Sequence, residues 1–132
     1  MRASLVIPVA QVLTWGCVIL LAILSLLPGR GIGFLYVLPE FNSMRAGLPG
    51  RLEHFIAYAA SAAVAMAGYG ASWGGVRIIG TFWVYAAVLE YLQHVSAGRH
   101  PSLGDFAASA FGALCGALTI ALLWLRPFDQ PS

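Results

Sequence analysis

The sequence predicts an all-α integral membrane protein, a four-helix antiparallel bundle with a long first loop. Its 132 residues are 60% hydrophobic and only 9% charged, and their mean hydropathy of +0.83 leaves too little polar surface to cover a soluble globule. Apolar stretches of about twenty residues recur, each long enough to cross a hydrocarbon core of about 30 Å. Such stretches are too long and continuous for barrel strands, and lipid cannot pair exposed backbone groups, so helices are the expected form. The predicted spans are 7–27, 52–71, 76–95 and 103–125, within a single domain of residues 1–132.

The first stretch is expected to stay as a membrane anchor. A basic residue, Arg2, precedes it, as in a signal peptide, but about twenty apolar residues exceed a signal peptide's apolar region. No small-x-small cleavage pattern follows its end at Leu27. Cys17 and Cys115 fall inside predicted spans, where we expect small apolar residues rather than a disulfide.

Four spans place both termini on one membrane side, together with a short turn at Ser72 to Gly75. The long first loop, 28–51, shares the other side with 96–102. Arginines on the terminal side meet little opposing charge, whereas those on the loop side lie among acids and are interpreted as serving a site. Although the arginine count slightly favours loops inside, we therefore expect cytoplasmic termini. The terminal side has Arg2, Arg77, Arg126 and Asp129; the loop side has Arg30, Arg45, Arg51, Arg99, Glu40, Glu53, Glu90 and Asp105.

Ionisable residues gather where the predicted spans meet the loop side. Glu53 and His54 open the second span, Glu90, Gln93 and His94 close the third, and Arg99 to Asp105 lead into the fourth. Alternating helix direction brings them all to one membrane face, over which the first loop is expected to fold as a cap. Glu90 opposes the dipole of its own helix end, so we expect it to need a cationic partner, either His94 or Arg99.

Local helix chemistry offers a second interpretation of several of these residues. Ser102 and Asp105 fit a capping box, and Glu53 suits the positive end of its helix. His54 and His94 also fit ordinary interfacial histidines. Arg51 and Arg99 fit side chains that extend to lipid headgroups.

The spans themselves contain packing patterns rather than reactive groups. Small residues recur every four positions in the second and fourth spans, which predicts faces that approach a neighbouring helix closely. Tryptophans lie mostly near span ends, as an aromatic belt predicts. The small residues are Ala59, Ala63, Ala67, Ala108, Gly112 and Gly116; the tryptophans are Trp73, Trp83 and Trp124.

The polar residues permit several chemical functions. A metal site is weakly indicated, because Glu90 and His94 at i, i+4 form no recognised metal spacing. Arginine with histidine and carboxylate suits binding or cleavage of a phosphate. The segment GRHPSLGDFAASAFGALCGA is similar to the last motif of membrane phosphatidic-acid-type phosphatases, but His100 is one residue too far from Asp105 and that family's other motifs do not occur.

The segments RLEHFIAYAA and LEYLQHVSAGRHPSLGDFAASAFGALCG resemble the VanZ-like family. Between them they span about half of the chain and match the family's order: a His-Phe-x-x-Tyr, a Glu-x-x-Gln, then Gly-Arg and an Asp before a glycine-rich helix. Leu52-Glu53 replaces the family's common Asp-Lys, and Ser109 replaces an Asn. The matching positions are His54, Phe55, Tyr58, Glu90, Gln93, Gly98, Arg99, Asp105, Gly112 and Gly116.

The resemblance implies a multi-pass protein of the bacterial inner membrane from a family whose founding member is linked to teicoplanin resistance, with no agreed molecular activity. We expect recognition of an anionic or amphiphilic envelope ligand, with hydrolysis of lipid or polyprenyl phosphates and then proton-coupled transport as alternatives. Whether the chain is an enzyme and how it oligomerises stay open. No metal, cofactor or nucleic acid is expected, and membrane lipids are the expected partners. The predicted ligand-binding residues are His54, Tyr58, Glu90, Gln93, Arg99 and Asp105, of which His54, Glu90 and Asp105 are catalytic candidates.

Overall fold

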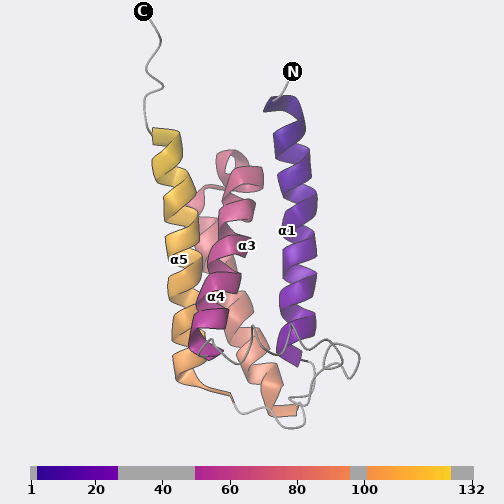
Figure 1. Ribbon diagram of the computed structural model, residues 1–132, viewed down its shortest axis with the longest axis vertical. Helices are drawn as coiled ribbons and strands as arrows, with labels where there is room; N and C mark the ends of the chain where they lie inside the picture. The colour runs from indigo at the N-terminus through magenta and orange to yellow at the C-terminus, as the bar shows by residue number, and fades with distance from the viewer. Residues whose placement is uncertain (1–2, 27–49, 96–100, 126–132) are drawn as a thin grey trace, which may run out of the picture.

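The computed structural model describes residues 3–26, 50–95 and 101–125, and their secondary structure consists of long helices (Figure 1). Four helices are long and apolar enough to cross a membrane, which confirms the predicted class. The predicted bounds differ from the observed ones by a few residues, and Leu27 lies outside the described part. The elements are α1 (Ala3–Leu26), α3 (Gly50–Trp73), α4 (Gly75–Leu92), the short 3-10 helix η2 (Gln93–Val95) and α5 (Leu103–Leu125).

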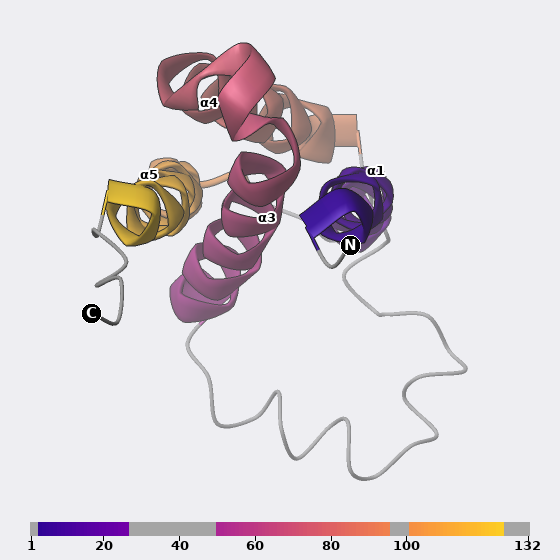
Figure 2. The same cartoon turned by 90° about the horizontal axis from the view of Figure 1, so that it is seen from above.

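The helix α3 occupies the middle of the bundle. Seen from above, α3 lies between α1 and α5, while α4 lies along one side of these three helices (Figure 2). Its most extensive packing is with α5 and then with α1, and α4 packs mainly on α5 and α3. The start of α1 and the end of α5 lie at one end of the bundle, which we call the terminal end (Figure 1). The opposite end, where α3 and α5 begin, is the loop end.

Small residues allow α3 and α5 to lie very close together. A Cβ on Gly112 would overlap the carbonyl oxygen of Phe55, and one on Gly116 would overlap that of Ala59. Ala62 and Ala113 are fully buried in the core. Most large apolar side chains on the outer surfaces are exposed, as expected of helices that face lipid. The small-residue pattern of α5 is therefore confirmed as a packing surface at both glycines.

The connection between α3 and α4 is shorter than predicted. The sequence predicts a turn at Ser72 to Gly75, but only Gly74 separates the two helices. Its φ of +77° is a backbone conformation that L side chains rarely adopt. Its N–H donates to the carbonyl of Gly70 and its own carbonyl accepts from Ile78. A single glycine thus reverses the chain while leaving its backbone groups paired.

Hydrogen bonds from polar side chains to backbone carbonyls link neighbouring helices. The Gln11 amide donates to the carbonyl of Gly68, 3.1 Å away, and the Tyr85 hydroxyl donates to that of Val18. Trp83 donates to the carbonyl of Ala110 at 2.9 Å. Trp83 lies midway along α4, so the aromatic-belt interpretation is wrong for this residue: its N–H serves helix pairing instead.

Candidate functional site

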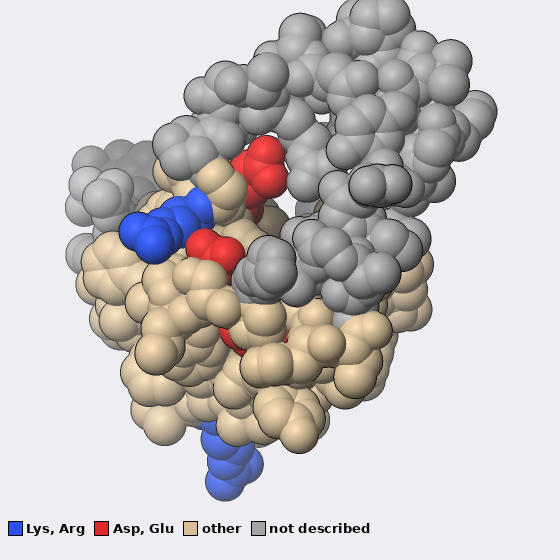
Figure 3. All heavy atoms as spheres, turned by 90° about the horizontal axis from the view of Figure 1, so that it is seen from below, with Lys and Arg blue, Asp and Glu red and all other residues tan. Residues whose placement is uncertain are grey.

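The described acidic residues all lie at the loop end. Glu53 is in the first turn of α3, Glu90 in the last turn of α4, and Asp105 in the first turn of α5. Arg51 lies beside them, whereas Arg77 is at the start of α4 near the terminal end. Viewed from below, acidic and basic side chains appear together on this face (Figure 3). Antiparallel helices thus bring together charges that are widely separated in the sequence.

Glu90 accepts a hydrogen bond from the backbone of the following helix. Its Oε1 lies 2.5 Å from the backbone nitrogen of Ser102, the residue before α5. The Ser102 hydroxyl in turn accepts from the N–H of Gly104 at 3.2 Å. The predicted capping box is therefore half correct: Ser102 caps α5, but its own N–H is paired with Glu90 rather than with Asp105.

His94 is not the cation that neutralises Glu90. Its side chain is exposed, and its ring Nδ1 bonds the carbonyl of Tyr91, 2.9 Å away in the same helical segment. This local bond turns the ring towards its own backbone, so the predicted i, i+4 pair does not form. The other predicted partner, Arg99, lies outside the described residues.

Asp105 instead forms an ion pair with Arg51 of α3. The Arg51 Nε lies 3.8 Å from Oδ1 of Asp105. Gly104 makes this approach possible, because a Cβ at that position would lie only 2.6 Å from the same Nε. The Arg51 side chain is 71% exposed, so the pair contributes only about 0–1 kcal/mol of stability.

His54 contacts the middle of the bundle through Ser109. The Ser109 hydroxyl lies 3.3 Å from Nδ1 of the His54 ring, and Ser109 is 2% exposed. This bond fixes the direction of a partly buried imidazole and occupies one of its two nitrogens. The sequence analysis did not predict this pair, because Ser109 lies in a small-residue stretch typical of helix packing. Its position two turns after the start of the helix was the feature that could have indicated a polar contact there.

Tyr58 lies one turn deeper than His54 on α3. It is 2% exposed and packs edge-to-face against Phe82 of α4, with ring centroids 6.3 Å apart. Tyr58 therefore forms the inner wall of the polar region rather than an exposed contact.

Gln93 is the one buried side chain whose hydrogen bonding is incomplete among the described residues. It is 3% exposed and continues the buried stripe of α4 formed by Phe82, Ala86 and Leu89. Its Nε2 has no hydrogen-bond partner in the described parts of the chain. Burying an unpaired amide costs about 1–3 kcal/mol, so such a group calls for an explanation.

Three of the described predicted site residues thus lie near one end of the bundle but in separate pairs, and Arg99 lies outside the described residues. Glu90 pairs with the Ser102 backbone, Asp105 with Arg51, and His54 with Ser109. No hydrogen bond joins His54, Glu90 and Asp105 to one another in the segments that the structure describes. Within those segments, no three metal-ligating side chains are grouped so that they could hold an ion. The first loop, predicted to cover this face, falls mostly in 27–49, outside the described residues.

Comparison with known proteins gives no relative. No family model matches the chain, and neither a curated protein nor a solved structure shows detectable similarity to it. The resemblance to the VanZ-like family therefore stays a prediction that depends on the motif residues alone.

Proposed function

We propose that this chain is a VanZ-like protein of the bacterial inner membrane that binds the polar head of an amphiphilic envelope molecule at the loop end. The observation that carries the proposal is the buried amide of Gln93, whose Nε2 lacks a partner within the described residues. An amide N–H seeks an oxygen acceptor, which a phosphate, carboxylate, carbonyl or sugar hydroxyl supplies. The proposed ligand therefore has an oxygen-rich head and an apolar tail that stays in lipid.

The charge at this face favours an amphiphile over a simple anion. Glu53, Glu90 and Asp105 outnumber Arg51 among the described residues of the loop end. Two of the acids are already engaged, Glu90 by the Ser102 N–H and Asp105 by Arg51. Selectivity would then come from directed hydrogen bonds, with Gln93 as donor, rather than from a net positive field.

The test compares two glutamines that differ in one respect. Gln11 donates to the Gly68 carbonyl, whereas the amide of Gln93 is unpaired within the described chain. Replacing a buried unpaired amide by an apolar group removes a penalty, while breaking a formed bond costs about 0.5–1.5 kcal/mol. We expect Gln93→Leu to unfold at the same or a higher temperature in detergent, and Gln11→Leu to unfold at a lower one.

The same two variants should also differ in their response to a ligand. Undecaprenyl phosphate and phosphatidic acid serve as probes, with the thermal shift of the purified protein as readout. Gln93→Leu should lose most of the ligand-induced shift, and also any teicoplanin resistance conferred on a host lacking the protein, while Gln11→Leu keeps both. A full shift and full resistance in Gln93→Leu would contradict the proposal.

A second function, hydrolysis of lipid phosphates, is favoured by the His54–Ser109 bond. Because Ser109 engages Nδ1, the Nε2 of His54 is left for proton transfer to or from a substrate. Water would attack phosphorus and the bond from phosphorus to the lipid oxygen would break. A proton from the water would pass through Nε2 of His54 to the lipid oxygen, so that the lipid alcohol leaves and inorganic phosphate is formed. The test measures phosphate released by the purified protein from polyprenyl or phosphatidyl phosphate. Release that is lost in His54→Ala would establish hydrolysis, whereas binding of these lipids without release would support the binding function alone.

A further inference from the structure

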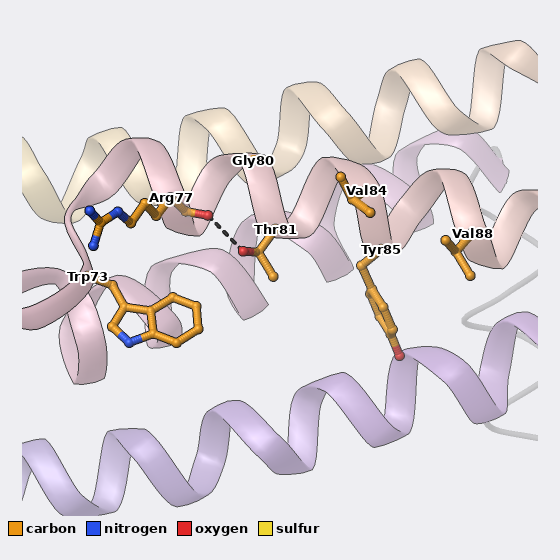
Figure 4. A pocket seen from close by; sticks show the side chains of 7 residues that line it. All are labelled: Trp73, Arg77, Gly80, Thr81, Val84, Tyr85 and Val88. Atoms are coloured by element: carbon orange, nitrogen blue, oxygen red, sulfur yellow. Dashed lines mark hydrogen bonds between the residues drawn. The ribbon is translucent and has the colours of Figure 1, made fainter.

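A groove runs along the outer surface of α4, starts near the terminal end and is lined by none of the predicted site residues of the loop end. It has a volume of about 730 Å³ and begins beside Trp73 and Arg77. From there it continues past Gly80 and Val84 to Tyr85 and Val88. Figure 4 shows Arg77 to Val88 along one stretch of α4, with Trp73 at the end of α3 and the Tyr85 ring reaching towards the neighbouring helix α1.

Beyond Arg77 the groove offers an apolar surface, although it contains two hydroxyl groups. The Thr81 hydroxyl donates to the carbonyl of Arg77 at 2.8 Å, the dashed contact in Figure 4. The Tyr85 hydroxyl donates to the carbonyl of Val18. Both protons are thus used within the protein, so the remaining lining suits a hydrocarbon chain.

The end of the groove at Arg77 is polar and positively charged. Arg77 is exposed in the first turn of α4, and no acid of the described segments lies at that end of the bundle. The helix start adds a partial positive charge of its own. Trp73, half exposed, ends α3 beside it, as is common at a membrane–water interface. A negatively charged group is the complement of this end.

The dimensions agree with one leaflet of a bilayer. Arg77 and Val88 are eleven positions apart in the sequence. At about 1.5 Å per residue, α4 rises about 16 Å between them, roughly half of a 30 Å hydrocarbon core. One acyl chain with its headgroup at Arg77 therefore fills the length of the groove.

We propose that this groove binds a phospholipid of the surrounding bilayer, with an anionic headgroup at Arg77 and one acyl chain along Gly80, Val84 and Val88. The inference does not depend on the function of the loop end. Gly80 allows a direct test, because a Cβ added there meets nothing within 4 Å. A leucine side chain at position 80 would therefore occupy the groove without displacing neighbouring side chains or backbone.

The experiment measures lipid retained after release of the protein from nanodiscs of phosphatidylglycerol and phosphatidylcholine, by native mass spectrometry. Wild-type protein should retain more phosphatidylglycerol than phosphatidylcholine. Arg77→Gln should reduce that preference about five- to tenfold, and Gly80→Leu should reduce retention of both lipids. Gly16→Leu on α1 is the matched control, because its Cβ also meets nothing within 4 Å and Gly16 does not line the groove.

Two results would overturn the proposal. Equal retention of both lipids by wild type, Arg77→Gln and Gly80→Leu would show that no lipid is held there. Conversion of a wild-type dimer to a monomer by Gly80→Leu, with lipid retention unchanged, would make the groove an interface between copies. Thermal unfolding of each variant in detergent confirms that folded protein is compared.

Discussion

At the scale of single residues, Glu90 shows how a charge that is unfavourable for one helix serves the next. A carboxylate in the last turn of α4 faces the negative end of that helix dipole. The same carboxylate accepts the N–H of Ser102 at the start of α5, where a negative charge is favoured. Its position is therefore explained by the geometry of two helices together and not by either alone.

The free energy of unfolding of Glu90→Gln should lie within about 1 kcal/mol of the wild-type value, because the amide retains an oxygen that can accept a hydrogen bond from the Ser102 N–H. Glu90→Ala should lose about 1–3 kcal/mol, since the partly buried N–H of Ser102 is left without its acceptor. Thermal unfolding in detergent, beside membrane abundance, measures both. His94→Ala is the control, expected within about 0.5 kcal/mol because that side chain is exposed. Wild-type stability in Glu90→Ala would show that the contact contributes nothing.

The order of the spans made the positions of His54, Glu90 and Asp105 near one end of the bundle predictable, but not the partners of these residues. The sequence indicated that Glu90 needs a partner, yet a survey of cationic side chains cannot identify a backbone N–H twelve residues later. Likewise, His54 and Ser109 are separated by 55 positions, and only the packing of α3 against α5 brings them together. Motif positions are local properties, whereas the pairing depends on tertiary geometry.

At the scale of whole helices, the spans were predictable because length and hydropathy alone decide them. The central position of α3 was not, since every span is apolar and the four differ little in length. What distinguishes α3 is its run of small residues, which lets α5 approach until Gly116 touches the Ala59 backbone. Close backbone contact of this kind replaces the hydrophobic driving force that is missing between helices in lipid.

Gly116→Ala should therefore destabilise the bundle more than the addition of one methyl group suggests. Its Cβ would collide with the carbonyl of Ala59, which is backbone and cannot rotate away, so the two helices must separate. The expected loss is about 1–3 kcal/mol, measured by thermal unfolding in detergent. Gly16→Ala, with open space around the new Cβ, should be neutral or slightly stabilising. Equal stability of the two variants would refute close α3–α5 packing.

At the scale of the whole molecule, the charged groups divide between the two ends of the bundle. All acids of the described residues lie at the loop end, and Arg77 lies near the terminal end without an acid of those segments beside it. Unopposed arginines near span ends favour the cytoplasmic side. We therefore propose cytoplasmic termini, with the Gln93 region facing the envelope.

Cysteine labelling of intact cells tests this orientation. Cys17 and Cys115 are free and partly buried within spans, so both are first replaced by alanine. Gly50→Cys introduces an exposed thiol at the loop end, where a Cβ meets nothing within 4 Å, and Ser132→Cys introduces one at the chain terminus. An impermeant maleimide should label Gly50→Cys before lysis and Ser132→Cys only after it, because four spans place the two positions on opposite sides. The reverse pattern would place the Gln93 region in the cytoplasm, and labelling of both before lysis would contradict the three spans between the two positions.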